Sequence, residues 1–427
     1  SQDSRLSRMG AELVMALKRT QGALFWWLER SIGVGAVVAG CGLAAPAIAQ
    51  FVPNEKLVSP NPALVDAEFS QSRAKIAWTD SKGVLWLGNV NRDTGAFSPL
   101  SGQGQQIATG TVSGLNMFLW NGPEWISMAD GDQVYFSYYL PGMPPTAQNT
   151  RMALAILDGN GALKNVRRMR PNVPRMADIA SQTEGDKNAQ IMYFDPDYNH
   201  YWRNVLSESS EQIMPFLPAE DKAWRFATGI RAMLYTAPVS GTPQVFRYML
   251  DTAVSEQLSF DAGDKDTGRT VPWMWPAPEF GGDFVFSTVV NGSELRVYRE
   301  MTAPDGGQSW TPIHSASMPE GRTAGSPQWF TYNGKSYLYW VAYVSPNDFP
   351  TEVWLSNIDA VQPLLRRVNS DSTFRVRNDP EHFITTTYGP LIYYNRYDPS
   401  RDPTGDHPLC AACSEGVFRA DPGLLGR

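Results

Sequence analysis

The sequence predicts an all-β protein that folds as one β-propeller of seven blades, each with four short antiparallel strands. Gly (36) and Pro (32) are frequent among the 427 residues, and 12% are aromatic, a mixture typical of many short strands and turns. No segment after residue 50 shows a sustained helical period. A pattern of about fifty residues recurs along the chain, which is the size of a propeller blade.

The repeat is marked by a triplet of Pro, then Glu or Gln, then an aromatic residue or His. The triplet occurs at 123–125, 278–280, 327–329 and 380–382, and three degenerate copies fit the same spacing. The middle position supplies one residue to each predicted blade: Glu68, Glu124, Asp178, Arg225, Glu279, Gln328 and Glu381. Six blades are the alternative, because the copy around Arg225 is weak.

An apolar or alternating segment follows each of these seven positions and predicts a strand. The expected strands cover 75–78, 134–139, 191–194, 232–235, 284–290, 336–344 and 391–394. We expect the triplet to begin the innermost strand of each blade, because Pro has no ladder N–H and fits at a strand start. A further strand at 416–419 is expected to pair with the N-terminal strand, since ring closure removes the open edge.

Residues 1–49 are expected to lie outside the propeller as a signal peptide or membrane anchor. Basic residues precede the charge-free run 31–49, which ends in the small-x-small pattern of a signal peptidase site at Ala47 to Ala49. The run is also long enough for an uncleaved anchor. As a third alternative, the segment 38–41 resembles a bacterial lipobox, with Cys41 as the lipidated residue.

All three alternatives predict an extracytoplasmic protein that is periplasmic, secreted or lipid-anchored in the cell envelope. The expected domains are the signal or anchor at 1–49, a linker at 50–61, the propeller at 62–421 and a tail at 422–427. In an oxidising compartment, Cys410 and Cys413 are predicted to form a local disulfide. A metal site that includes His407 is the alternative.

Composition excludes several classes of function. The net charge is −7 and the body of the chain has no long basic run, so a nucleic-acid partner is not expected. Four His and three Cys are too few for a zinc finger or ribbon. We expect a monomer that contacts a membrane only through the N-terminal segment.

Two segments carry family resemblances. The hairpin over Tyr248–Asp261 resembles the repeat of TolB-type periplasmic propellers, and Ala303–Trp310 resembles the Asp-box of sialidases and related propellers. These resemblances imply a propeller fold. For the Asp-box they also imply a structural turn, in which Asp305 accepts backbone N–H bonds and Trp310 packs between sheets.

Side chains at the same position of every blade are expected to converge at one mouth of the central channel. The predicted ligand-binding residues are Glu68, Glu124, Trp125, Asp178, Arg225, Trp275, Glu279, Gln328, Trp329 and Glu381. Carboxylates of this kind suit Ca²⁺ or the hydroxyls and amines of a polar ligand, and Trp rings can stack on sugars. The alternative is that these residues repeat because blade folding requires them.

Two functions of different class remain open. The first is a non-enzymatic envelope propeller that binds a glycan or a protein partner at the channel mouth. The second is a secreted glycoside hydrolase, which needs two carboxyl groups across the scissile bond. The catalytic candidates are Glu124, Glu279 and Glu381, which are expected to point into one funnel.

Overall fold

The computed structural model describes most of the chain after residue 54. The described residues are 55–98, 104–111, 122–126, 132–182, 190–197, 199–205, 211–214, 225–265, 272–319, 322–325, 327–344, 349–369, 374–405 and 408–426, and the side chains of 178–182 are not described. The predicted signal or anchor at 1–49, with Cys41, lies outside these residues, and so does His407.

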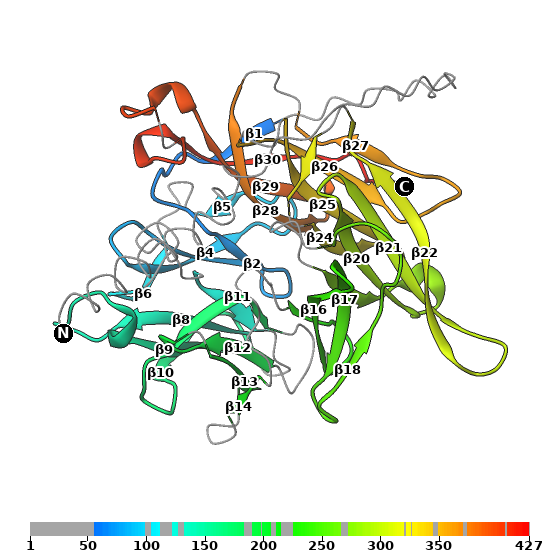
Figure 1. Cartoon of the computed structure of the whole chain (residues 1–427). Helices are drawn as coiled ribbons and strands as arrows, with labels where there is room; N and C mark the ends of the chain where they lie inside the picture. Colours follow the sequence, from blue (N-terminus) through cyan, green and yellow to red (C-terminus); the bar gives the residue numbers. More distant parts are fainter. Residues whose placement is uncertain are drawn as a thin grey trace.

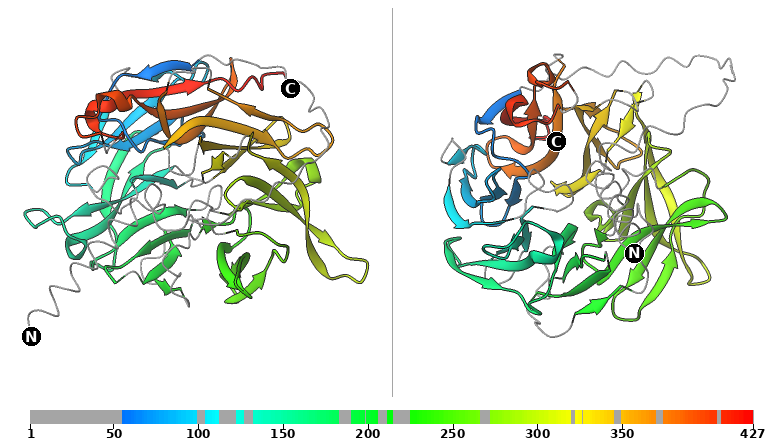
Figure 2. Two further views of the ribbon diagram at one scale, coloured as in Figure 1. Left: turned by 45° about the horizontal axis from the view of Figure 1, so that its top comes forward. Right: turned by 60° about the vertical axis from the view of Figure 1, so that its left-hand side comes forward.

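Seven sheets surround a central axis, so the chain is a seven-bladed β-propeller, as predicted (Figures 1 and 2). Blade 1 contains β2 (Glu68–Ser70), β3 (Lys75–Thr79), β4 (Leu85–Val90) and β5 (Phe97–Ser98), with β6 (Gln105–Ala108) also paired to β4. Blade 2 contains β7 (Glu124–Ile126), β8 (Gln133–Tyr139), β9 (Thr150–Leu157) and β10 (Leu163–Arg168). Blade 3 contains β11 (Met176–Gln182), β12 (Gln190–Phe194), β13 (His200–Asn204) and β14 (Gln212–Ile213).

The next three blades repeat the same antiparallel order outward from the axis. Blade 4 contains β15 (Arg225–Phe226), β16 (Ala232–Val239), β17 (Thr242–Met249) and β18 (Val254–Gln257). Blade 5 contains β19 (Trp273–Pro276), β20 (Phe284–Val290), β21 (Glu294–Thr302) and β22 (Gln308–Ser317). In blade 6, β23 (Thr323–Ala324) and β24 (Gln328–Tyr332) both pair with β25 (Lys335–Tyr343), followed by β26 (Pro350–Asn357) and β27 (Leu365–Arg367).

Blade 7 closes the ring with strands from both ends of the described chain. It contains β28 (Val376–Thr385), β29 (Gly389–Tyr397), β30 (Ser414–Ala420) and β1 (Glu55–Ser59). The strand β1 pairs antiparallel with β30, and the two lie side by side in blue and red in Figure 1. Ring closure is therefore confirmed, because one blade combines strands from both ends of the described chain.

The predicted boundaries at the two ends need correction. The segment 50–61, expected to be a linker, contains β1, because the closing blade takes its outermost strand from there. Within the expected tail at 422–427, Leu424 is fully buried against a cluster that includes Tyr394 and Phe418. The ends of the propeller are therefore held in place by packing on both sides of the closure.

The second strand of every blade supplies the core. Each predicted apolar segment falls on such a strand, from β3 to β29, although the segment predicted to end at 344 stops one residue earlier in β25. All five residues of β12 are buried, and in β25 only the first is not. The clusters lie between neighbouring blades, as where Trp275 of blade 5 meets Leu338 and Trp340 of blade 6. This packing holds the strand ends, and the turns that join them, in fixed positions.

Two local features lie away from the axis. The segment that resembles an Asp-box forms the turn between β21 and β22, where the Gly307 N–H donates to Asp305 at 3.0 Å. Trp310 packs on Phe286, with 5.2 Å between ring centroids. The predicted disulfide between Cys410 and Cys413 is present.

Among the described residues, none of the helices has the length and apolar character needed to cross a bilayer.

Candidate functional site

The starts of the innermost strands bring several predicted residues to one level of the propeller axis. Glu68, Glu124, Arg225 and Gln328 are the first residues of β2, β7, β15 and β24, and Glu381 lies within β28. Three of these residues have a Tyr directly opposite on the second strand: Glu124 pairs with Tyr135, Gln328 with Tyr339 and Glu381 with Tyr393. The triplet therefore marks one strand register in these blades.

The carboxyl groups of this level lie close enough to repel one another, and we call them the axial carboxylates: Asp66, Glu68, Glu124, Asp379 and Glu381. Burial raises the pKa of Glu68 well above its usual range, and Glu124 and Glu381 raise it further. Because these groups come from blades 7, 1 and 2, they meet only at the axis. Like charges at this range disfavour simultaneous ionisation.

Two aspartates extend the cluster toward the loops that enter the innermost strands. Burial raises the pKa of Asp379 to about 8, with a further contribution from Asp66. The pKa of Asp66 is raised to about 6, also by burial, although a hydrogen bond from the Gly122 N–H opposes the shift. A Cβ atom at position 122 would collide with the Asp66 carboxylate, so glycine there permits this backbone approach.

A cationic side chain lies across the axis from these carboxylates. Arg225 of blade 4 is 6% exposed, and burial lowers its pKa to about 9 against the opposing effect of Glu124 and Glu381. Its guanidinium stacks over the ring of Trp273, 3.5 Å from the centroid. Within the described part of the chain, the buried Nε of Arg225 and indole nitrogen of Trp273 have no hydrogen-bond partner.

A hydrogen-bond chain from blade 6 orients Glu381. The Gln328 amide donates to Glu381 at 2.9 Å, and the Tyr339 hydroxyl donates to the Gln328 carbonyl oxygen at 2.7 Å. The Tyr339 oxygen also lies 3.1 Å from His382 Nδ1. Since a phenol has one proton, His382 Nδ1 must donate to Tyr339. Burial lowers the pKa of His382 to about 4, so its imidazole is neutral at pH 7.

The position predicted for Glu279 is wrong. The innermost strand of blade 5 is β19, and the triplet follows this strand instead of preceding it, in the short helix η2 (Pro278–Phe280) that joins β19 to β20. Glu279 therefore lies at the other end of the innermost strand. Trp273 begins β19, beside Arg225, and occupies the axial position that the triplet was expected to fill.

The predicted aromatic residues pack between blades. The Trp125 indole N–H donates to the Glu68 carbonyl at 2.8 Å, and Trp125 is 3% exposed. Trp275 is fully buried and stacks on Trp329 with 5.0 Å between centroids. Trp125 and Trp275 thus offer no free ring face to a ligand. Asp178 lies within β11, and its side chain is not described.

Sequence reasoning missed Asp66 and Asp379 as site residues. The signal for the aspartates was their spacing, since each precedes the glutamate of its blade by two residues. Both have left-handed backbone, with φ of 51° and 56°, which Asp tolerates better than most residues.

Over the described residues, no group of three His, Cys, Asp or Glu side chains is placed to hold a metal ion. The axial carboxylates come from three blades, and the guanidinium of Arg225 comes from a fourth, so the level offers acceptors on one side and donors on the other. Such a site can accept and donate hydrogen bonds on opposite sides of a bound molecule.

Among known proteins, the chain is similar only to solved structures, and it matches no family model and no curated protein. TolB from Acinetobacter baumannii is similar over 70% of this chain and 79% of its own, with 13% identity and a TM-score of 0.34. Trypanosoma rangeli sialidase is similar over 89% of this chain and 60% of its own, at 10% identity and a TM-score of 0.41.

A third similar structure is the α-L-arabinanase of Penicillium chrysogenum in complex with arabinobiose. It covers 44% of this chain and 63% of its own, with 13% identity and a TM-score of 0.29. At such low identity these likenesses concern the fold alone.

Proposed function

We propose that this protein is an extracytoplasmic propeller that binds a neutral saccharide at the propeller axis without altering it chemically. The observation that carries the proposal is the opposition of two walls. Blades 7, 1 and 2 supply the axial carboxylates, whereas blades 4 and 5 supply Arg225 and Trp273, whose buried Nε–H and indole N–H groups lack protein partners among the described residues. A buried donor without a partner costs free energy unless a ligand or water accepts from it.

A saccharide hydroxyl satisfies both walls, because it donates one hydrogen bond and accepts others. Its protons can go to the axial carboxylates, and its oxygens can accept from Arg225 and Trp273. The raised pKa of Asp379, about 8, keeps part of its population protonated at pH 7, so this group can donate as well. A cationic ligand would leave the N–H groups unused and would be repelled by Arg225.

An oxidising compartment is part of the proposal. The Cys410–Cys413 disulfide supports it, because disulfides persist in secreted, periplasmic and cell-surface proteins. The partner would then be a glycan of the cell envelope or its surroundings. Fractionation of the native host, followed by detection of the protein, tests this placement, and recovery from the cytosol would contradict it.

Calorimetric titration with a panel of neutral oligosaccharides tests the binding site. For the oligosaccharide that binds, Arg225→Met is expected to weaken affinity at least tenfold, since it removes donors that have no substitute. Arg299→Met is the matched control, because Arg299 also stacks on an aromatic ring, 4.4 Å from the centroid of Phe280, but lies away from the axis. Equal affinity of the wild type and Arg225→Met, or binding of a lysine-rich peptide instead of any saccharide, would overturn the proposal.

A glycoside hydrolase is the second candidate, and the raised pKa values of Asp379 and Glu381 favour it. A carboxyl group that keeps its proton at pH 7 is what a general acid requires, and a second carboxylate must lie across the bond. Release of 4-nitrophenol from aryl glycosides tests this activity. Turnover that is lost in both Glu124→Gln and Glu381→Gln would replace simple binding as the function.

A further inference from the structure

We propose a second binding site, separate from the axial carboxylates, in the cavity between blades 5 and 6. The geometry points to a small amine with an apolar body as its ligand. The cavity has a volume of about 450 Å³, within the range of small-molecule sites. Its lining comes from the turns after β19 and β24, which are innermost strands, and from the loop after β26, the third strand of blade 6. The axial carboxylates lie near the starts of the innermost strands, so the cavity is on the opposite face of the propeller.

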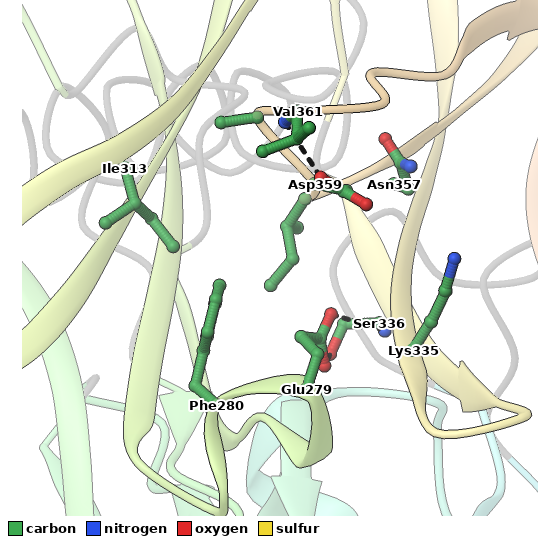
Figure 3. A pocket seen from close by; sticks show the side chains of 10 residues that line it. Glu279, Phe280, Ile313, Lys335, Ser336, Asn357, Asp359 and Val361 are labelled. Atoms are coloured by element: carbon green, nitrogen blue, oxygen red, sulfur yellow. Dashed lines mark hydrogen bonds between the residues drawn. The ribbon is translucent and has the colours of Figure 1, made fainter.

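The walls of the cavity are largely apolar. Phe280 of η2 and Ile313 of β22 come from blade 5, while Ile358 and Val361 come from the loop after β26 in blade 6 (Figure 3). Val361 forms the rim and is 88% exposed. An apolar ligand body can displace water from these side chains, which supplies most of the affinity of such sites.

One carboxylate in the cavity is held rigidly by neutral groups. Glu279 accepts hydrogen bonds from the Ser336 N–H at 2.7 Å and from the Ser336 hydroxyl at 2.9 Å. The fully buried Trp275 donates its indole N–H to the same hydroxyl at 3.0 Å. Since the indole can only donate, the single proton of Ser336 is directed to Glu279. The carboxylate is thereby fixed before any ligand arrives.

The loop opposite Glu279 is fixed in a similar way. Asn357 bonds across its base, donating to the Gln362 carbonyl at 2.8 Å and accepting from the Leu364 N–H at 2.8 Å. Asp359 accepts from the Val361 N–H at 2.8 Å. These bonds close the turn onto itself, so the rim does not depend on a ligand for its shape. Preorganised walls reduce the entropic cost of binding.

The charges of the cavity select the ligand. Glu279 makes no ion pair with any described residue, and its neighbours in the hydrogen-bond chain are neutral. Lys335 extends toward the loop that carries Asp359 (Figure 3). Backbone hydrogen bonds lower the pKa of Asp359, and the positive charge of Lys335 lowers it further. The positive charge of Lys335 offsets the negative charge of Asp359. The negative charge of Glu279 is then the net charge of the cavity, and it favours a ligand with one ammonium group.

The test uses three ligands of similar size and different charge: 2-phenylethylamine, 2-phenylethanol and phenylacetate. Titration calorimetry on the full chain at pH 7 is expected to show binding of the amine at least tenfold tighter than the alcohol, and no binding of the acid. Tighter binding of the acid would assign recognition to Lys335 and overturn the proposal, as would equal binding of amine and alcohol.

Variants locate the site. Glu279→Gln is expected to abolish the preference for the amine over the alcohol, and Ile313→Trp to block both ligands by filling the cavity. Glu381→Gln, at the axis, is the matched control and should leave amine binding unchanged. Far-UV circular dichroism and thermal melting confirm that each variant is folded. If Glu381→Gln rather than Glu279→Gln removes amine binding, the ligand binds at the axis and the second site does not exist. The saccharide titrations are independent of this outcome.

Discussion

The axial carboxylates and Glu279 show two ways in which one fold accommodates a partly buried acidic group. At the axis, burial raises the pKa of Glu68, and the neighbouring carboxylates Glu124 and Glu381 raise it further. At the other end of the innermost strands, Glu279 accepts hydrogen bonds from the hydroxyl and N–H of Ser336 and lines a largely apolar cavity that also contains Lys335. The two regions therefore differ in how their stability should respond to the loss of a charge.

The difference follows from where a side chain lies along the strand. Residues at the start of the innermost strand face their counterparts from other blades, so charges accumulate around one axis. Residues in the following turn face only the next blade, and an isolated groove forms between two blades. Position along the strand, more than residue type, decides which chemistry a glutamate has in this propeller.

The largest expected effect tests whether both regions depend on ring closure. Arg377 of β28 bonds to Glu55 of β1 at 3.0 Å, and their side chains are 1% and 4% exposed. Arg377→Ala removes the nearer cationic partner of the buried Glu55 and leaves Arg396 at 3.8 Å, so it is expected to lower the free energy of unfolding by about 3 kcal/mol. Urea denaturation should show one cooperative transition in which both regions are lost together.

The control for this variant is Arg401→Ala. Arg401 pairs with Asp398 but its side chain is 52% exposed, so its loss is expected to cost less than about 1 kcal/mol. An unchanged midpoint for Arg377→Ala, or a variant in which blade 5 unfolds separately, would show that closure does not hold the two regions together.

The second prediction concerns pH at the axis. The pKa of Asp379 is about 8 in the folded protein against an ordinary value of 3.8, so the folded state retains a proton that the unfolded state has released. Stability is therefore greatest below about pH 4 for this group and falls as pH rises to about 8. Asp379→Asn should flatten this fall and be more stable than the wild type at pH 8.

Asparagine suits this test because it tolerates the φ of 56° at position 379. Urea denaturation at pH 5 and pH 8 measures the slope for both proteins. A wild type whose unfolding free energy is the same at both pH values would contradict the account of the axial carboxylates.

The smallest expected effect belongs to Glu279. In Glu279→Gln, the single amide oxygen can accept from only one of the two Ser336 donors, which bond to separate carboxylate oxygens in the wild type, and the bond that remains is no longer charge-assisted; together these changes cost about 1–2 kcal/mol. Urea denaturation at pH 7 measures this cost. A loss of stability as large as that of Arg377→Ala would contradict the account of Glu279 as a carboxylate held by neutral donors.

Much of the fold could be predicted because the second strand of each blade carries the same apolar pattern in the sequence. Segments such as 134–139 and 391–394 are apolar, must be buried on both faces, and so remain recognisable in every blade. The seven-blade count and the closure by 416–419 followed from the same pattern. The contribution of residues 55–59 did not, since three of the five residues of β1 are not buried and carry little apolar signal.

The candidate site could be predicted only where the triplet keeps its register. Glu68, Glu124, Arg225 and Gln328 were found because each is the first residue of its strand, and Glu381 was found because the triplet also occurs inside β28. Blade 5 was misaligned, because Pro278 and Glu279 reproduce the triplet in a turn, where Pro is also favourable at the start of a short helix. The spacing of a motif does not distinguish the two ends of a four-residue strand.

A crystal structure of the protein soaked with both the saccharide that it binds and 2-phenylethylamine tests the central claim most directly. The account predicts the saccharide at the axis, with hydroxyl oxygens within hydrogen-bond distance of Arg225 and Trp273, and the amine in the cavity between blades 5 and 6, with its ammonium on Glu279. Density for the saccharide anywhere away from Arg225, or both ligands in one place, would contradict the assignment of two distinct sites to the two ends of the innermost strands.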